Sequence, residues 1–417
     1  MRPLRIAVLD EELPFPATSG KRIRTFNLLA RLAERHRVTV LCHRNPDRRE
    51  AFAADDAFRQ LGIETVIVER SVPAKSGPAF YARLAGNLLS PLPYSVSSHS
   101  SPALATAVRR FAAKHRVDVW HCEWTPYAQV LRDAFGKRFR AARWSVMAHN
   151  VESLIWRRYM ETEANPMKRW YVRQQLQKFE TFERWAYSSA SAAIAVSEPD
   201  AELMRERFGV GEVSVVENGV DTDYFRPQRD VDRDPARVLF LGSLDWRPNQ
   251  DAVNLLLNDI FPKVRGQVPE ATLALVGRHP PDWLRARAAE SPGVELYPDV
   301  PDVRPFLASC GMLAVPLRIG GGSRLKILEA LATGTPVVST RIGAEGLNLA
   351  AGRDLKIAEG IDGMAEAIIR GIRHPYELED CAERGRRSVL AQYDWSPLAE
   401  KLDEVWWTVA TTEAVAA

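Results

Sequence analysis

A cluster of glycines and cations between residues 320 and 326 is the part of this chain best suited to bind an anion. It comprises Gly320, Gly321, Gly322, Ser323, Arg324 and Lys326. Glycine has no Cβ, so backbone N–H groups in such a loop can approach an anion closely. A helix that begins after the loop adds a dipole that favours negative charge at its N-terminus. The pattern therefore predicts a phosphate site, although an isolated glycine cluster before a helix is more often only a turn.

Glu329 lies one turn further along the same predicted helix, three residues after Lys326, on the face that should be buried. Burying a carboxylate is costly unless it has partners. Those partners are either hydroxyl groups of a ligand beside the bound phosphate or Lys326 in an ordinary i,i+3 ion pair. Because glycines, cations and an inward carboxylate occur together, the ligand-binding interpretation is favoured.

The elements that would hold this cluster follow one another as strand, loop, helix and strand. Residues 311–317 are an apolar run that fits a buried strand, and apolar side chains from Leu325 to Leu331 recur at helical spacing. Gly334 ends the helix, and residues 335–340 resume as a strand. Such units build parallel sheets, whose ligands bind at the carboxyl ends of the strands.

The first fifty residues contain a similar unit. Residues 4–9 are typical of a buried strand, residues 22–35 of an amphipathic helix and residues 38–42 of a second strand. Gly20 and Lys21 lie between the first strand and the helix, and hence at the carboxyl edge of the predicted sheet. This position predicts another part of a ligand site, with a simple hinge into the helix as the alternative for Gly20.

Polar side chains also follow two later strands. His149, Asn150 and Glu152 come directly after one predicted strand, and Asn218 follows another. These positions again lie at the carboxyl edge of the sheet. Histidine changes its charge near neutral pH, so His149 is a candidate to donate or accept a proton or a hydrogen bond at a substrate. The alternative is a histidine that only satisfies its own loop.

Length and composition limit the class of protein. The 417 residues are 46% hydrophobic and 26% charged, as expected for a globular chain of roughly two or three domains. A net charge of +3 argues against general nucleic-acid binding. The four scattered cysteines predict free thiols in a reducing, cytoplasmic setting and no structural zinc site. No apolar run approaches the ~20 residues of a membrane span, and the first is too short for a signal peptide, so any membrane contact is expected to be peripheral.

Residues 155–187 are rich in aromatic and basic side chains, and Pro166 divides them into two helical pieces. The simplest interpretation is a helical pair that packs its aromatic side chains on the sheet. The second is an acceptor-binding surface. The third is a segment that lies on anionic lipid at the inner face of a membrane. The last two would suit an amphiphilic acceptor.

Alternating strands and helices in two successive halves predict an α/β protein. Residues 1–225 form the expected N-terminal domain, the charged and proline-bounded residues 226–237 a linker, and residues 238–393 the C-terminal domain. Residues 394–417 form an amphipathic helix and a tail. The expected architecture is two Rossmann-like parallel-sheet domains that face a cleft, with the ligand site in it.

In its motifs the sequence resembles glycosyltransferase family 4 (glycosyl transferases group 1), the retaining enzymes of the GT-B fold. In the second half the resemblance is carried by GSLDWRPN at 242–249, LVGR at 275–278, VPDV at 300–303, GGGSRLKILEA at 320–330 and GTPVV at 334–338. In the first half it is carried by Ser19-Gly20 with Arg24, Asn27 and Leu28, by HNVE at 149–152 and by NGVD at 218–221. It spans nearly the whole chain.

The resemblance implies a GT-B fold, a nucleotide-diphosphate sugar as donor, and a last helix that packs back on the N-terminal domain. It assigns Glu329 to the donor ribose, backbone near Val300 to the nucleobase, and His149 to a place near the transferred sugar. The other residues expected at the donor are Gly20, Lys21, Gly242, Gly277, Arg278, Gly320, Gly321, Gly322, Ser323 and Arg324. Those expected on the acceptor side are Asn150, Glu152 and Asn218.

The chain departs from the family pattern at two points of the donor site. Many members have a glutamate eight residues before the match to Glu329, where this chain has Gly321. The sugar contact of that glutamate would be lost or would pass to loop backbone. The usual arginine and lysine after the first strand of the second half are also absent, with Ser243 and Pro248 at or near their positions.

Other cations would then have to neutralise the leaving nucleoside diphosphate, which is the main electrostatic demand of glycosyl transfer. Arg247, Arg324 and Lys326 are the expected replacements. Together with His149, Arg247 and Lys326 are the candidate catalytic residues. No metal or other cofactor is expected, because these cations supply the charge and no Asp-x-Asp motif lies at a predicted site edge.

The leading function hypothesis is a retaining glycosyltransferase that moves a sugar to a glycan, a lipid-linked acceptor or a small molecule, as in the biosynthesis of cell-surface polysaccharide. The alternative is a degenerate transferase that binds a nucleotide sugar as a non-catalytic partner protein. A dinucleotide-dependent oxidoreductase is less favoured, because no G-x-G-x-x-G turn follows the first strand.

Overall fold

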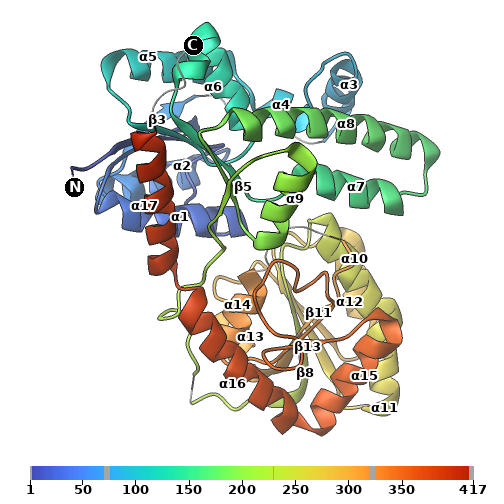
Figure 1. Ribbon diagram of the computed structural model, residues 1–417. Helices are drawn as coiled ribbons and strands as arrows, with labels where there is room; N and C mark the ends of the chain where they lie inside the picture. The colour runs from blue at the N-terminus through green and yellow to red at the C-terminus, as the bar shows by residue number, and fades with distance from the viewer. Residues whose placement is uncertain (1, 70–75, 229, 320–324, 413–417) are drawn as a thin grey trace. The chain divides into compact units, whose positions relative to one another are not determined.

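The computed structural model describes residues 2–69, 76–228, 230–319 and 325–412. The chain divides into two compact units, of which the first is Met1–Glu217 with Ser396–Ala417 and the second is Asn218–Trp395. Each unit is built on a parallel sheet with helices packed against it (Figure 1). The second unit begins at Asn218, seven residues before the end of the N-terminal domain predicted at residue 225.

The sheet of the first unit has seven parallel strands in the order β3-β2-β1-β4-β5-β6-β7. They are β1 (Arg5–Leu9), β2 (Arg37–His43), β3 (Glu64–Val68), β4 (Val119–Cys122), β5 (Trp144–Ala148), β6 (Ala192–Ala195) and β7 (Val213–Val215). The central strands are mostly apolar and buried, because both faces of a parallel sheet are covered. The strand order reverses between β1 and β4, and this switch point is where ligands of such sheets bind.

Nine α-helices of the first unit precede residue 217 in the described part of the chain. They are α1 (Gly20–Ala33), α2 (Arg48–Gln60), α3 (Pro78–Asn87), α4 (Tyr94–His99), α5 (Pro102–Lys114), α6 (Tyr127–Phe135), α7 (Glu152–Thr162), α8 (Pro166–Ser189) and α9 (Glu198–Phe208). Side-chain oxygens of Ser19, Asp47, Ser101, Asn165 and Ser197 cap five of them. These caps satisfy backbone N–H groups that the first turn of a helix leaves free.

The aromatic and basic segment forms α7 and α8, and the predicted division at Pro166 is confirmed. Asn165 caps α8 and Pro166 is its first residue, where a missing N–H costs nothing. Phe179 and Phe182 are buried, and the ring of Trp156 on α7 stacks on Phe179 with centroids 5.8 Å apart. Aromatic side chains on one side of α7 and α8 are therefore packed inside the first unit.

The sheet of the second unit has six parallel strands in the order β10-β9-β8-β11-β12-β13. They are β8 (Asp234–Leu241), β9 (Thr272–Gly277), β10 (Val294–Pro298), β11 (Cys310–Val315), β12 (Val337–Ser339) and β13 (Lys356–Ile357). Its α-helices in the described residues are α10 (Arg247–Leu255), α11 (Phe261–Gln267), α12 (Asp282–Glu290), α13 (Arg304–Ser309), α14 (Leu325–Ala332), α15 (Gly360–Arg373) and α16 (Pro375–Gln392). The switch point of this sheet lies between β8 and β11.

The linker predicted at residues 226–237 is wrong at its carboxyl end, because β8 already begins at Asp234. Asp234 pairs with Cys310 of β11, and Arg237 pairs with Thr272 of β9. These first residues of the strand are charged because they extend beyond the buried core. Backbone pairing, which composition does not reveal, therefore sets the start of the strand.

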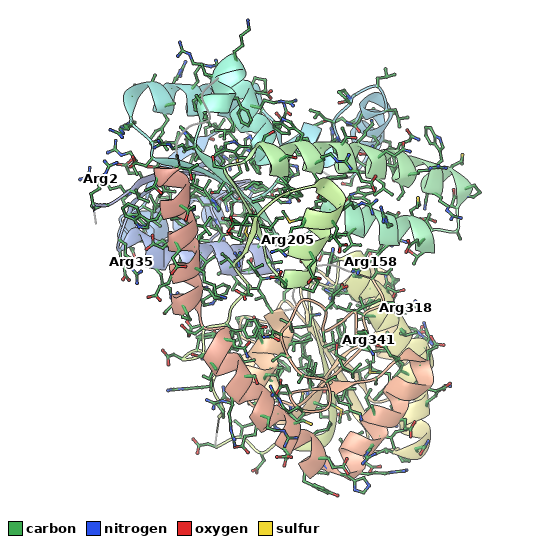
Figure 2. All side chains as sticks on the ribbon, viewed as in Figure 1. Arg2, Arg35, Arg158, Arg205, Arg318 and Arg341 are labelled. Carbon is green, nitrogen blue, oxygen red and sulfur yellow. The ribbon has the colours of Figure 1, made fainter. Side chains whose placement is uncertain are left out.

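The last helix, α17 (Trp395–Thr411), completes the first unit. Arg35, which is labelled in Figure 2, follows shortly after α1. Its guanidinium pairs with Glu400 of α17 at 3.3 Å. The buried His36 lies 2.7 Å through Nε2 from the Asp403 carboxylate. The helix α17 thus packs against the residues that follow α1.

Among the residues that the structure describes, no helix combines the length and the apolar character needed to cross a membrane. The four cysteines are free thiols, as predicted, and Cys42, Cys122 and Cys310 are buried.

Candidate active site

At the switch point of the first sheet, β1 ends in acidic side chains and α1 begins. Ser19 caps α1 through a backbone N–H at 3.4 Å, so Gly20 and Lys21 form the first turn. The Lys21 ammonium pairs with Asp10 and lies 3.7 Å from Glu11. Burial lowers the pKa of Lys21, but the charges of Asp10 and Glu11 outweigh it and raise that pKa above its usual value. The Lys21 ammonium is thus already paired with carboxylates of its own unit.

Glu123 follows β4 at the same switch point and links two histidines. Its buried carboxylate lies 2.9 Å from His121 Nε2 and 3.2 Å from His149 Nε2. The hydroxyl of Thr25 on α1 donates to it at 2.8 Å. Burial opposes ionisation, but hydrogen bonds from the two imidazoles hold the pKa of Glu123 well below its usual range. The imidazole of His149 therefore lies next to a buried, ionised carboxylate.

The loop after β5 continues from His149 through Asn150, which is half-buried, to Glu152 at the start of α7. The Glu152 carboxylate accepts a hydrogen bond from Trp124 Nε1 at 3.1 Å. The backbone N–H of Glu152 donates to Glu183 of α8 at 2.7 Å. Glu183 is fully buried, and this burial raises its pKa to about 8. Glu183 therefore fixes the start of α7, three residues after His149.

In the second unit, a lysine and an asparagine meet beside the end of β8. Lys326 of α14 donates to Asn249 Oδ1 at 3.2 Å, and its ammonium lies 4.8 Å from the centre of the Phe240 ring. Asn249 Nδ2 donates to the Ser243 carbonyl at 2.8 Å. A Cβ on Gly242 would lie 2.8 Å from Lys326 Nζ and 2.7 Å from Asn249 Nδ2. A side chain at 242 would displace these two groups, so glycine lets them approach the backbone this closely.

The loops after β8 and β9 pack backbone against backbone. A Cβ on Gly277 would overlap the carbonyl oxygen of Gly242. The Leu244 N–H donates to the Arg278 carbonyl at 2.8 Å, and the Arg278 guanidinium donates to Ser243 Oγ at 3.3 Å. Ser243 stands at the position where the family usually has an arginine. The guanidinium of Arg278, on the neighbouring loop, therefore lies beside that position.

Glu329 lies on α14 one turn after Lys326 and is half-buried. Burial raises the pKa of Glu329 to about 7, and the charge of Lys326 opposes this. Within the described ranges Glu329 makes no ion pair, so the simple i,i+3 pair with Lys326 is not formed. A hydroxyl donor would suit a carboxyl group that is half-protonated near neutral pH.

Three other predicted site residues are not among the contacts described above. Val300 packs on the hydrophobic core of the second unit, and Arg247 is the exposed first residue of α10. Asn218 is the half-buried first residue of the second unit. The remaining predictions lie outside the described residues, namely Gly320, Gly321, Gly322, Ser323 and Arg324.

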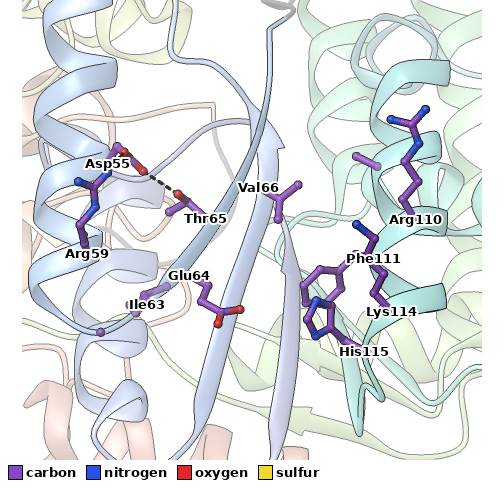
Figure 3. A pocket seen from close by; sticks show the side chains of 12 residues that line it. Asp55, Arg59, Ile63, Glu64, Thr65, Val66, Arg110, Phe111, Lys114 and His115 are labelled. Atoms are coloured by element: carbon purple, nitrogen blue, oxygen red, sulfur yellow. Dashed lines mark hydrogen bonds and ion pairs between the residues drawn. The ribbon is translucent and has the colours of Figure 1, made fainter.

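A pocket of about 740 Å³ lies elsewhere in the first unit, between α2, β3 and α5 (Figure 3). Arg59, Glu64, Arg110, Lys114 and His115 are among its lining residues. They belong to the amino end of β3 and to the last turns of α2 and α5. The pocket therefore lies at the edge of the sheet opposite the switch-point residues described above.

Sequence reasoning missed Glu123, the carboxylate that holds His149. A carboxylate two residues after a predicted strand was visible, and the same edge rule that selected His149 would have found it. In the described ranges, no group of three His, Cys, Asp or Glu side chains is arranged to hold a metal ion. The expectation that no metal or other cofactor is required stays a prediction.

Curated relatives share sequence with parts of this chain. Phosphatidyl-myo-inositol mannosyltransferase of Mycolicibacterium smegmatis is 30% identical over 226 residues, 52% of this chain and 57% of the relative. Glycogen synthase of Mycobacterium tuberculosis is 24% identical over 59% of this chain and 61% of its own length. The chain thus spans about three-fifths of these relatives. Phosphatidyl-myo-inositol mannosyltransferase of Mycobacterium leprae is 27% identical over 86% of this chain and 91% of the relative.

Solved structures share the fold. Sucrose-phosphate synthase from Thermosynechococcus elongatus aligns with a TM-score of 0.72 at 18% identity, over 98% of this chain and 99% of that chain. HepE of Anabaena, solved in complex with UDP and glucose, aligns with a TM-score of 0.66 at 14% identity, over 97% of this chain and all of that chain. Two Rossmann-like units with these neighbours define the GT-B fold, as predicted.

Two family models match consecutive parts of the sequence. The model described as Glycosyltransferase Family 4 matches residues 19–224, and the model described as Glycosyl transferases group 1 matches residues 235–374. The first covers most of the unit that holds His149, and the second covers the loops around Gly242 and Lys326. The chain therefore belongs to the glycosyltransferases that these two models describe, Glycosyltransferase Family 4 and Glycosyl transferases group 1.

Proposed function

We propose that this chain is a glycosyltransferase that moves a sugar from a nucleotide-diphosphate donor to an acceptor hydroxyl group. The observation that carries the proposal is the convergence of Lys326 and Asn249 on the glycine backbone at Gly242, with Glu329 one turn along the same helix. A cation beside a glycine backbone suits a diphosphate, and a half-buried carboxyl group suits the hydroxyls of a ribose. The group 1 family model covers all of these residues.

The leaving nucleoside diphosphate sets the main electrostatic demand of the reaction. As the glycosidic C–O bond breaks, negative charge develops on the diphosphate, and fixed cations stabilise it. Lys326 supplies one charge at Gly242, and Arg278, held at Ser243, supplies a second on the neighbouring loop. Arg247 at the first turn of α10 is a third candidate.

We further propose that the anomeric configuration is retained. The acceptor oxygen would attack the anomeric carbon on the face that the diphosphate leaves, and the acceptor proton would pass to the departing phosphate oxygen. No protein nucleophile is assigned. The coupling constant of the anomeric proton in the NMR spectrum of the product tests this point, because an inverted product contradicts retention.

The names of the relatives support a choice of donors. Two relatives are named as mannosyltransferases and one as a glycogen synthase, and HepE was solved with UDP and glucose. We propose a hexosyl donor on GDP or UDP and an acceptor that is a glycan, a lipid-linked sugar or a small molecule. Such a transfer would serve cell-surface polysaccharide synthesis.

We also propose that the exposed side of α8 rests on anionic lipid. Met167 and Trp170 are 79% and 55% exposed, next to the exposed basic residues Lys168, Arg169 and Arg173. Apolar and basic side chains together favour an interfacial site. Sedimentation with phosphatidylglycerol vesicles should weaken in the variant Trp170→Ala but not in Trp283→Ala, a matched exposed tryptophan of the second unit. Equal binding of both variants contradicts the proposal.

The decisive experiment incubates the protein with GDP- and UDP-hexoses and a panel of acceptors, and measures released nucleoside diphosphate. We expect turnover with one nucleotide family and its loss in Glu329→Ala. No release from any donor, by protein whose fold is verified by circular dichroism, contradicts the proposal. Binding of a nucleotide sugar without turnover would instead identify a non-catalytic partner protein.

A further inference from the structure

The strand β3 forms one side of the first sheet, and in the described part of the chain no strand lies beyond it. Its residues 64–68 pair with residues 39–43 of β2. Whereas most residues of the central strands are buried, Glu64 is exposed and the four residues after it are half-buried. An open edge strand offers its backbone to another chain, and native proteins cover or block such edges.

The backbone groups on the outer side of β3 belong to Thr65 and Ile67. The carbonyl of Val68 accepts a hydrogen bond at 2.9 Å from the N–H of Arg44, which follows β2, so Val68 faces the sheet. Residues of a paired strand face the neighbouring strand alternately. Thr65 and Ile67 therefore turn their N–H and C=O groups to the outer side, where no hydrogen-bond partner lies within the described ranges.

The pocket of about 740 Å³ lies beside this outer side (Figure 3). Its lining includes Glu64, Thr65 and Val66, consecutive residues whose side chains point alternately to the two faces of the sheet. Asp55 and Arg59 of α2 line the pocket on one side of β3, and α5 lines it on the other. A pocket that touches both faces passes round the outer side of the strand. We call it the β3 groove.

The two walls of the β3 groove differ in charge. On the α2 wall, Arg59 pairs with Asp55 at 2.7 Å, and Asp55 also accepts the Thr65 hydroxyl at 2.6 Å. On the α5 wall, Arg110 and Lys114 are exposed one helical turn apart. Among the described residues, neither of these two cations has an ion-pair or hydrogen-bond partner. The cations of the α5 wall are therefore available to a ligand.

The two other ionisable side chains of the lining are held within the first unit. Glu64 accepts the Thr39 hydroxyl at 3.1 Å, and the Arg5 guanidinium donates to His115 Nδ1 at 3.3 Å. The excess charge in the β3 groove is therefore positive and lies on α5. Carboxylates are the complementary groups, because they form charge-assisted hydrogen bonds with arginine and lysine.

We propose that the β3 groove is a docking site for one extended segment of a partner protein, which adds to the sheet beside β3 and presents acidic side chains to Arg110 and Lys114. The backbone of the segment pairs with the outer groups of Thr65 and Ile67, and every second side chain faces α5. Two flanking helices leave room for a single strand, whereas a second copy of this chain would bring its own pair of helices against the same walls.

Docking is measured by the fluorescence anisotropy of a labelled peptide of alternating glutamate and valine, about eight residues long. We expect it to bind the wild type, and a peptide of alternating lysine and valine to bind at least tenfold more weakly. The double variant Arg110→Glu, Lys114→Glu reverses the α5 wall and should weaken the acidic peptide at least tenfold. The matched control is Lys137→Glu, Arg138→Glu, at two exposed cations of the first unit outside the groove.

Three results of this titration overturn the proposal. They are the absence of binding at about 1 mM acidic peptide to folded protein, equal binding of the acidic and basic peptides, and equal losses in the two double variants.

Hydrogen exchange separates strand addition from binding by charge alone. With the acidic peptide bound, exchange measured by mass spectrometry should slow in the segment that contains Thr65 and Ile67, because their N–H groups gain partners. N-methylation of either all glutamates or all valines of the peptide should abolish binding, and methylation of the other set should not, because alternate N–H groups face the same strand. Unchanged exchange in β3, or equal effects of the two methylated peptides, overturns the proposal.

Self-association is the competing way to cover β3. Sedimentation velocity of the wild type with and without the acidic peptide tests it. A dimer that the peptide dissociates would identify a second copy as the occupant and overturn the proposal, whereas a sedimenting species whose number of copies the peptide does not change agrees with it. None of these measurements uses a nucleotide sugar, so their outcome is independent of the proposed function.

Discussion

The carboxyl edges of the two sheets are built from different interactions. In the first unit, charged groups meet charged or titratable partners, as Lys21 does with Asp10, and Glu123 with two histidines. In the second unit, Lys326 contacts the neutral amide of Asn249, and the loops around it are packed through glycine. The first edge is organised by its own charges, whereas the second brings cations to a glycine backbone.

This difference predicts which kind of ligand each edge prefers. A phosphate at Lys326 would exchange an amide for a full negative charge, so the interaction becomes stronger. A phosphate at Lys21 would have to compete with two carboxylates that are already in place. We therefore expect the nucleoside diphosphate on the second unit, and neutral hydroxyl groups on the first.

The largest expected effect comes from removing the cation of the second edge. Lys326→Ala should lower kcat/KM for the nucleotide sugar by about 10²–10³-fold, because the charge that develops on the leaving diphosphate loses a fixed partner. Lys263→Ala is the matched control, since Lys263 pairs with Asp362 at the exposed surface of the same unit. A loss below threefold in Lys326→Ala would contradict the role given to the second edge.

Gly277→Ala tests the glycine packing of the same edge. Its added methyl group would overlap the Gly242 carbonyl, so the free energy of unfolding should fall by about 3 kcal/mol and nucleotide affinity should drop about tenfold. Gly266→Ala on α11, where a Cβ meets no atom within 4 Å, is the control. Chemical denaturation and calorimetric titration measure the two effects, and equal behaviour of both variants would refute the packing argument.

The buried Glu183 tests how far the first edge depends on its own titratable groups. Burial raises its pKa from 4.5 to about 8, so the folded state binds a proton that the unfolded state releases above pH 4.5. Its contribution is complete below pH 4.5 and is lost as the pH rises to about 8, on the order of 5 kcal/mol. Glu183→Gln should flatten this decline in denaturation curves between pH 5 and 8, whereas Glu206→Gln, exposed on α9, should not. An unchanged slope in Glu183→Gln would count against the buried carboxyl group.

The smallest effect is expected at Asn249. Asn249→Ala removes the acceptor that orients Lys326 but keeps the cation, so turnover should fall only about threefold to tenfold. Steady-state kinetics under the conditions used for Lys326→Ala give the comparison. If Asn249→Ala is as damaging as Lys326→Ala, orientation rather than charge dominates the second edge.

Much of the fold could be predicted from the sequence, because apolar strands and amphipathic helices alternate regularly. The strand at residues 4–9 and the two helices divided at Pro166 appear almost as predicted. The predicted linker ended too late, at residue 237. Asp234 already belongs to β8, because its backbone pairs with a strand far along the chain. A charged, proline-bounded segment carries no local signal of such a partner.

Site residues could be predicted where they directly follow a strand, because the carboxyl ends of parallel strands mark the ligand-binding edge. The edge rule selected His149, the family resemblance named Gly242, and the structure brings Lys326 to Gly242. Contacts between distant segments were not predictable, such as Glu123 with His149 or Arg278 with Ser243. They depend on which loops become neighbours, and strand order is a property of the fold rather than of any one segment.

The central claim is that the second unit binds the nucleoside diphosphate through Lys326. Isothermal titration of GDP and UDP into the wild type, Lys326→Ala and Lys263→Ala tests it most directly. We predict that one nucleotide binds the wild type and Lys263→Ala equally and Lys326→Ala at least tenfold more weakly. Equal affinity of all three proteins, or no heat from either nucleotide with folded protein, would contradict the claim.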